Sequence, residues 1–116
     1  MTVFKRKGIN LVEIFNGVFL KKAIDSENNS KSVTLGEITI DPGCGLPLHK
    51  HTVEDCMFII EGKGKLFIGK NQYFIEEGDQ ILVPAGSHHS LENIGKEKLR
   101  LIFTYPSVNV ARTLIK

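Results

Sequence analysis

The chain has 116 residues, of which 41% are hydrophobic and 24% are charged, and its formal net charge is only +2. These values describe an ordinary soluble globular protein of one domain. The lysines are scattered along the chain, so the charge pattern does not predict binding to nucleic acid. No stretch approaches the roughly 18 to 20 apolar residues that cross a bilayer, and we expect no membrane contact and a cytoplasmic location.

A basic cluster at residues 5–7 precedes a fairly apolar run at residues 9–20, a combination that superficially resembles a secretory signal. Glu13 and Asn16 interrupt the run, and no small-x-small cleavage pattern follows it. Asn16-Gly17 is also a strong turn dipeptide of the kind that joins two antiparallel strands. We therefore expect a β-hairpin here and no signal.

The rest of the chain alternates short apolar runs with turns that contain Gly or Pro, and no segment is a convincing helix. Strands of about four to eight residues at spacings of about eight to twelve predict an all-β sandwich or barrel. The tail at residues 106–116 could be a short helix or an added strand. The expected strands are residues 12–15, 18–24, 33–40, 65–68, 72–75, 80–83, 88–92 and 99–105.

The stretch at residues 43–62 carries two histidines one residue apart, His49 and His51, with an acidic pair just downstream. Side chains at positions i and i+2 of a strand point to the same face, so the pair can present two imidazoles to one ion. A third ligand is expected from residues 78–93, because a histidine there follows a Pro-x-Gly bend that re-aims the next strand.

These two stretches resemble the two signature motifs of the cupin superfamily. The first motif is a glycine, five residues, His-x-His, three or four residues, an acid, six residues and a glycine. It is matched at Gly43, His49, His51, Asp55 and Gly62. The second motif is a glycine, five residues, Pro-x-Gly, two residues, a histidine, three residues and an asparagine. It is matched at Gly78, Pro84, Gly86, His89 and Asn93.

The resemblance implies one cupin domain over residues 1–116, a jelly-roll β-barrel with a metal ion held inside by His49, His51, Asp55 and His89. The family usually has Glu where this chain has Asp55. Aspartate is one methylene shorter, and metal–oxygen bonds of about 2.0–2.2 Å leave little slack. Asp55 could therefore bind directly with a shifted strand, bind through a water, or leave a ligand position open.

Glu54 is the competing acidic ligand. On a regular strand Glu54 points the opposite way from Asp55 and His51, although a bulge between residues 52 and 54 could reverse this. Strand parity therefore favours Asp55. Three imidazoles with at most one carboxylate suit one divalent transition metal ion (Fe, Mn, Ni, Zn or Cu) better than Mg or Ca, and ligand type does not choose among them.

Three further residues near the motifs carry reactive side chains. His88 could act as an acid or base, but it should face the other side of its strand from His89, which favours a surface or interface position. Without a secretory signal, Cys44 and Cys56 are expected to be free thiols. Cys44 could contact a substrate or simply fill a small buried space, whereas Cys56 is expected to pack against its neighbours.

Residues on both faces of the strand that begins at Asp55 are apolar. Met57 and Ile59 share the parity of Asp55 and should line the interior beside the metal, whereas Phe58 and Ile60 should face outward. An apolar outer face in so small a domain indicates a second sheet or a partner subunit, and we expect a homodimer.

Two classes of function fit these features. A metal that acts as a Lewis acid or works with O₂ would give an isomerase, a lyase or a dioxygenase, and the resemblance permits all three. The alternative is a non-catalytic barrel that holds a small ligand or a sugar for sensing. A regulator without a DNA-binding extension would need a partner, so we favour an enzyme acting on a small-molecule substrate. No catalytic residue beyond the metal ligands is identifiable.

Overall fold

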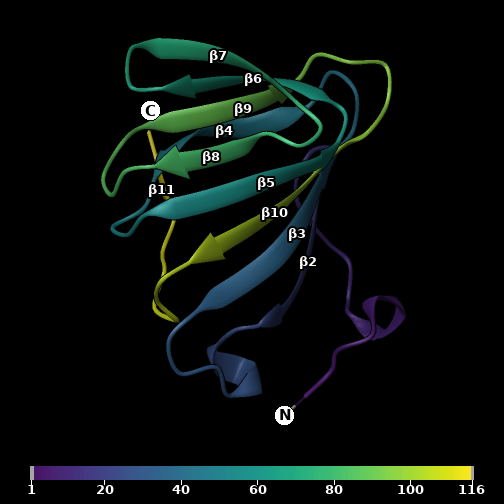
Figure 1. The fold of residues 1–116 in the computed structure, drawn as a ribbon, viewed down its shortest axis with the longest axis vertical. Coiled ribbons are helices and arrows are strands. Elements are labelled where there is room, and N and C mark those ends of the chain that lie inside the picture. The colour runs from purple at the N-terminus through teal and green to yellow at the C-terminus, as the bar shows by residue number, and fades with distance from the viewer. Residues whose placement is uncertain (1, 116) are drawn as a thin grey trace.

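The computed structural model describes residues 2–115, which form two antiparallel β-sheets packed against each other (Figure 1). The first sheet has six strands in the order β1, β2, β3, β10, β5, β8, and the second has five in the order β11, β4, β9, β6, β7. The strands are Val12–Phe15 (β1), Val18–Ile24 (β2), Thr34–Ile40 (β3), Gly45–Lys50 (β4), Asp55–Glu61 (β5), Lys63–Ile68 (β6), Asn71–Glu76 (β7), Gln80–Val83 (β8), His89–Asn93 (β9), Leu99–Tyr105 (β10) and Thr113–Leu114 (β11).

The prediction of an all-β fold is confirmed, and the expected hairpin at Asn16-Gly17 joins β1 to β2. Four strands, β1, β2, β8 and β10, have the predicted bounds, because turn residues flank each of them closely in the sequence. Strands β6 and β7 are longer than expected, and β9 begins at His89 rather than at His88.

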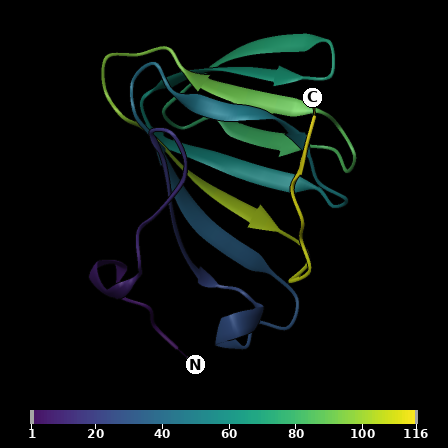
Figure 2. The ribbon, with the colours of Figure 1, turned by 180° about the vertical axis from the view of Figure 1, so that it is seen from behind.

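The tail forms a strand. Strand β11 pairs with the end of β4, with Thr113 opposite Lys50 and Leu114 opposite His49. Figure 2 shows this yellow segment running from the end of β10 to the end of β4. The helical segments described are two short 3-10 helices, η1 (Arg6–Gly8) and η2 (Ser26–Asn28). Within residues 2–115, no helix is long and apolar enough to span a membrane.

Strand β10 shows how side-chain alternation builds the core. Leu99, Leu101, Phe103 and Tyr105 are buried, while the residues between them are partly exposed, as the period of two in a strand requires. Inward-facing residues of both sheets form one apolar cluster between them. The buried members of the cluster are Val18, Ile38, Ile40, Leu46, Met57, Ile59, Leu66, Ile75, Val83, Leu91, Leu99, Leu101, Phe103 and Tyr105.

Strand β5 presents an apolar face on each side. Met57 and Ile59 are buried, as predicted, and Phe58 is exposed on the outer face of the six-stranded sheet. Cys56 is also exposed, so the expectation that it packs is wrong: it shares the parity of Phe58, and the segment at residues 2–9 lies against the outer face at β2, β3 and β10 but leaves Cys56 uncovered. Leu82 of the neighbouring strand β8 is exposed beside them. The homodimer expected from such a face stays a prediction.

Candidate metal centre

His49 is placed by the pairing of β4 with β9, in which it lies directly opposite His89. The register of this pair shifts between Leu46 and His49, a local irregularity that redirects the end of β4. The Nδ1–H of His49 donates to the carbonyl oxygen of Pro47 at 2.6 Å. Since this bond fixes the tautomer and the ring orientation, the Nε2 atom of His49 is left as a free acceptor.

His51 lies one residue beyond the end of β4, not on the same regular strand as His49. Its position is nevertheless fixed from two sides. The Nδ1–H of His51 donates to the carbonyl of Ala111 in the tail at 3.2 Å, and the carbonyl of His51 accepts a bond from Gly86 N at 2.8 Å. The first motif is therefore tied directly to the Pro-x-Gly bend of the second motif.

That bend is a tight turn in which Ser87 N donates to Pro84 O at 3.1 Å. Gly86 has a φ of 79°, a left-handed conformation that glycine adopts without a steric penalty. The chain then enters β9 at His89, whose Nδ1–H donates to the carbonyl of Ser87 at 3.0 Å. The bend thus turns the third histidine inward, as the sequence predicted.

The three imidazoles converge inside the barrel. His49, His51 and His89 are 1%, 4% and 3% exposed, and one ring nitrogen from each lies within 4.8 Å of the others. All three Nδ1–H groups are committed to main-chain carbonyls, so the Nε2 atoms are the ones available to a ligand. The Nε2 of His89 has no hydrogen-bond partner. An unpartnered buried acceptor is costly unless something else occupies it.

Asp55, the first residue of β5, completes the cluster from the other sheet. Its Oδ2 lies 3.8 Å from His51 Nε2 and 3.7 Å from His89 Nε2, and its Oδ1 is buried without a hydrogen-bond partner. Glu54, the competing acid, is exposed to solvent. The geometry therefore favours Asp55 over Glu54 as the carboxylate of the site, whereas direct coordination by Asp55 stays a prediction.

Burial controls the charge of the histidines. It lowers the pKa of His49 to about 3, even though the Pro47 carbonyl acts in the opposite direction. Burial also lowers the pKa of His51, against the hydrogen bond to Ala111 and the charge of Asp55. Both imidazoles are therefore neutral at physiological pH. Neutral imidazole is the form that binds metal ions, so these ligands need not first lose a proton.

Tyr105, at the end of β10, is a site residue whose place the sequence reasoning did not identify. Its hydroxyl donates to His51 Nε2 at 3.2 Å, and its ring lies 4.9 Å from the His51 ring, centroid to centroid. Burial and the charge of Asp55 raise the pKa of Tyr105, so the phenol stays protonated. Its inward orientation could have been predicted, because Tyr105 shares its parity with the apolar residues of β10 that face the core.

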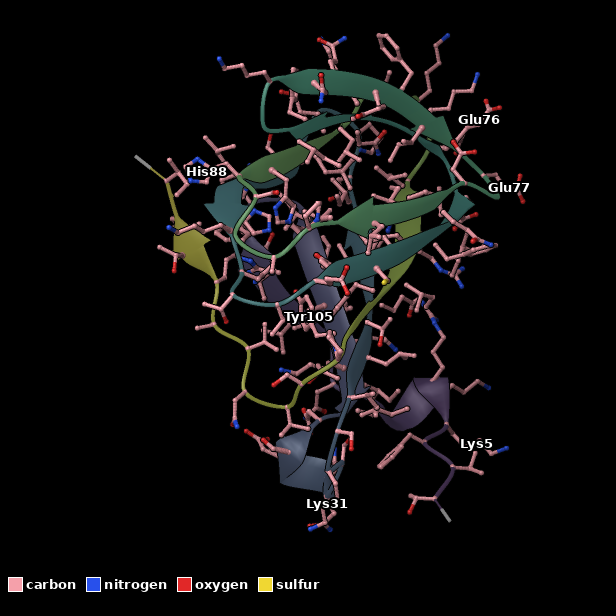
Figure 3. All side chains as sticks on the ribbon, turned by 60° about the vertical axis from the view of Figure 1, so that its left-hand side comes forward. Lys5, Lys31, Glu76, Glu77, His88 and Tyr105 are labelled. Atoms are coloured by element: carbon pink, nitrogen blue, oxygen red, sulfur yellow. The ribbon has the colours of Figure 1, made fainter. Side chains whose placement is uncertain are left out.

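Two other reactive residues lie outside the cluster. His88 is exposed, as its parity predicted, and Figure 3 shows it at the periphery of the molecule. Cys44 is partly buried and packs against the apolar core, with its Sγ filling the space beside Gly17. Cys44 therefore fills space next to the first hairpin, and both cysteines are free thiols.

Two hollows lie at different places on the barrel. A cavity of about 220 Å³ includes His51, Tyr105 and Arg112 in its lining. A larger hollow of about 740 Å³ is lined by residues such as Glu61 and Glu77 and contains none of the predicted ligands. Glu61 ends β5 whereas Asp55 begins it, so the larger hollow lies at the opposite end of the barrel from the histidines. The larger of the two hollows is therefore not the one beside the candidate metal ligands.

The donor set fits a divalent transition metal ion. Three imidazoles and one carboxylate are the ligands that first-row transition metals bind in proteins. The unpartnered His89 Nε2 and Asp55 Oδ1 are buried atoms that such an ion would satisfy. Coordination needs metal–ligand bonds near 2.0–2.2 Å, and the spacing of at most 4.8 Å between the ring nitrogens is compatible with one shared ion.

Comparison with known proteins places these residues in a family context. A 75-residue segment, 63% of this chain, is 33% identical to an uncharacterized protein of Methanocaldococcus jannaschii and spans 60% of its length. Oxalate decarboxylase of Bacillus subtilis, whose Mn(II) centres have been studied, matches with a TM-score of 0.86 and 24% identity over 97% of this chain and 31% of its own.

A third similar protein is the polyketide cyclase RemF from Streptomyces resistomycificus. It matches with a TM-score of 0.83 and 20% identity over 100% of this chain and 87% of its own. At these identities the two solved structures show the fold, and they confirm the jelly-roll barrel expected from the sequence. The family model described as the cupin domain matches residues 36–105, a range that includes both motifs. The chain belongs to the cupin family.

Proposed function

We propose that this chain is a metal-dependent enzyme for a small-molecule substrate. In this proposal His49, His51, His89 and Asp55 hold one divalent transition metal ion. The observation that carries it is the convergence of three Nε2 atoms whose Nδ1 partners are all tied to the main chain. A structural cluster of histidines would satisfy its buried nitrogens internally, yet His89 Nε2 has no hydrogen-bond partner, and the nearest carboxylate oxygen of Asp55 lies 3.7 Å away.

An ion at this place would supply Lewis-acid or redox chemistry, which corresponds to isomerase or lyase activity in the first case and dioxygenase activity in the second. The chain's own residues would prepare the site. The three main-chain carbonyls hold the imidazole rings in one orientation, so little reorganisation accompanies binding. Tyr105 keeps its proton at neutral pH and can donate a hydrogen bond beside His51.

The cavity beside His51 supports a small substrate. Its volume of about 220 Å³ is below the roughly 300–1,000 Å³ of pockets for drug-sized ligands. Part of its wall is apolar, formed by residues such as Phe103, Val108 and Val110. Apolar walls limit the access of water and strengthen the electrostatic interactions inside.

The fold neighbours also support an enzyme. Oxalate decarboxylase and a polyketide cyclase are both named as enzymes, and the Mn(II) centres of the former lie in a protein of the same fold. These activities are those of the neighbours, and the two neighbours catalyse different reactions. The proposal for this chain is therefore limited to metal-dependent turnover of a small molecule, by O₂ chemistry or by a redox-neutral reaction.

The experiment is a metal-dependent activity screen. Metal-free protein is loaded in separate samples with Fe(II), Mn(II), Ni(II) or Zn(II). Consumption of O₂ is followed with catechol, thiol and diketone substrates, and anaerobic samples are assayed for isomerised or cleaved products by mass spectrometry. We expect turnover with at least one ion, none in metal-free protein, and loss of turnover in His51→Ala.

His88→Ala is the matched control, since it removes an exposed histidine next to the motif. Undiminished turnover in metal-free protein or in His51→Ala would contradict a metal-dependent enzyme. Protein that binds one ion and a small ligand tightly but turns over none of the substrates would instead identify a non-catalytic sensing or storage barrel.

A further inference from the structure

Arg112 is a charged residue of the tail that no motif accounts for. It is partly buried, and its Nε atom is shielded from solvent without a hydrogen-bond partner. No carboxylate within residues 2–115 lies within salt-bridge distance of it. The Tyr105 hydroxyl is close enough to Arg112 to share a side-chain hydrogen bond with it. A guanidinium has five N–H donors and no acceptor, so the unpartnered Nε–H is left for an acceptor from elsewhere.

The main chain holds Arg112 firmly against the metal centre. The residue before it, Ala111, accepts the hydrogen bond from His51 Nδ1, and the residue after it, Thr113, pairs with Lys50 at the end of β4. Further along the tail, Ile115 N donates to Leu48 O at 3.0 Å. The hydrogen bond between Ala111 and His51 therefore fixes the backbone next to Arg112 as well as the His51 ring.

The side chain of Arg112 is oriented by Phe15, at the end of β1. The guanidinium carbon lies 5.3 Å from the centre of the Phe15 ring, within the range of a cation–π contact. Arg112 also lines the 220 Å³ cavity together with His51 and Tyr105. Its positive charge is near enough to act against protonation of His49 and His51.

The balance of charge in this region calls for an anion. A divalent ion held by neutral imidazoles would have only Asp55 as a counter-charge, and Arg112 adds a further positive charge across a weakly screening interior. The other charged residues of the cavity lining are Lys22, Asp25 and Glu27, and the carboxylate of Asp25 accepts from Asn28 N and lies 3.9 Å from Lys22 Nζ. Glu27 is exposed.

We propose that the cavity beside His51 binds a small carboxylate, which Arg112 receives through its guanidinium and Tyr105 through its hydroxyl. The inference deepens the proposed function and rests on it, because it names the substrate class of the same site. A planar guanidinium matches a carboxylate in geometry and charge better than any neutral group. With an ion on His51 Nε2, the Tyr105 hydroxyl would lose its present acceptor and become free to donate to the bound carboxylate.

The test compares pyruvate with pyruvamide, its neutral amide, by NMR titration of Zn(II)-loaded and metal-free protein labelled with ¹⁵N. In the parent we expect pyruvate to bind at least about tenfold more tightly than the amide, as charge-assisted bonds predict. Arg112→Gln should remove most of this preference without changing the zinc content. Lys22→Gln, which removes another cation of the same cavity lining, should keep it.

Equal binding of pyruvate and pyruvamide by the parent would overturn the proposal, and this comparison needs no substitution. An unchanged preference in Arg112→Gln would overturn it as well. Because titration of the metal-free protein also measures the preference, a protein that fails to bind zinc would contradict the proposed metal centre alone. The carboxylate site would then be judged on the metal-free data.

Discussion

His89 and Asn93 are the two ends of strand β9, and both belong to the second motif and are buried. Their hydrogen bonding differs. The Asn93 side chain donates to Ile40 O and Glu97 O, both at 2.8 Å, and accepts from Gly95 N at 2.9 Å. His89 satisfies only Nδ1, and its Nε2 has no partner. Within one motif, the satisfied residue has a structural role and the unsatisfied residue marks the site.

The first motif divides in the same way. Asp55 begins β5 with a buried oxygen that lacks a partner, and Gly62 follows the end of the strand. Gly62 has a φ of 93°, and a Cβ there would lie 2.6 Å from the carbonyl oxygen of Lys98. Any other residue would be strained and would clash with the backbone. The turns at the end of the barrel opposite the histidines therefore depend on motif residues such as Gly62 and Asn93.

The largest effect is expected at the His89 end of β9, where a buried nitrogen has no hydrogen-bond partner. His89→Ala should lower the affinity for Zn(II) by more than about a hundredfold, which exceeds the 10–100-fold effect of residues that only orient a ligand. Competition with a chromophoric chelator measures this affinity. His88→Ala is the control because it removes the exposed neighbour. Equal losses in both variants would remove the distinction between the two histidines.

Asn93→Ala tests the other end of β9, where the buried side chain is fully hydrogen-bonded. The substitution removes three hydrogen bonds and leaves two carbonyls short of a donor, so the free energy of unfolding should fall by about 2–4 kcal/mol in urea titrations. The zinc affinity of the folded variant should stay within about twofold, because distant sites act independently. A loss of zinc binding comparable to that of His89→Ala would show that the two ends are coupled.

Asp55 should have an intermediate effect. Asp55→Asn removes the charge but keeps the shape, and we expect a loss of about ten- to a hundredfold in Zn(II) affinity. Asp55→Glu, which restores the usual residue of the family, should retain binding. Calorimetric titration compares the three proteins. An unchanged affinity in Asp55→Asn would show that this carboxylate neither binds the ion nor orients its ligands.

The histidine end should also make the metal-free protein sensitive to acid. The folded chain holds the pKa of His49 near 3, whereas a histidine in the unfolded chain titrates near 6.5. Between these two pKa values the unfolded state therefore binds a proton that the folded state does not bind. The free energy of unfolding falls as the pH drops from about 6.5 toward 3, by up to about 1.4 kcal/mol per pH unit. Urea unfolding at pH 7.5 and pH 5 measures the difference. A His49→Gln variant with the same pH dependence as the parent would contradict this assignment.

The smallest effect is expected for Tyr105→Phe. It removes the hydroxyl that competes for His51 Nε2, so zinc affinity should stay the same or rise by up to about fivefold, the value of one net hydrogen bond. Turnover should fall, since the donor beside the ion is lost. If the chelator competition shows a tenfold weaker affinity instead, Tyr105 takes part in binding the ion.

The sequence predicted much of this division, because spacing carries most of the information. Turn residues marked the ends of β8 and β10, and motif spacing predicted that His49, His51 and His89 lie together, as they do. The expectation that His49 and His51 share one strand was inaccurate, since β4 ends between them and hydrogen bonds from the tail and the Pro-x-Gly bend position His51.

Other features depend on contacts that spacing does not contain. Arg112 reaches the site because the tail pairs with β4 and Ala111 accepts from His51, and neither contact has a local signal. Cys56 was expected to pack because its parity is opposite to that of Asp55, which faces the site. Its burial depends on what covers the outer face of the sheet, and the segment at residues 2–9 covers that face beside Glu37 and not beside Cys56.

The most direct measurement of the central claim is the position of the ion itself. Crystals of protein loaded with zinc, and purified without a His-tag or chelator, can be measured on both sides of the zinc absorption edge. We expect one anomalous peak per chain, about 2.0–2.1 Å from the Nε2 atoms of His49, His51 and His89. No peak among the three histidines, or a peak only at the charged far end beside Glu76 and Glu77 (Figure 3), would contradict a metal site at the histidines.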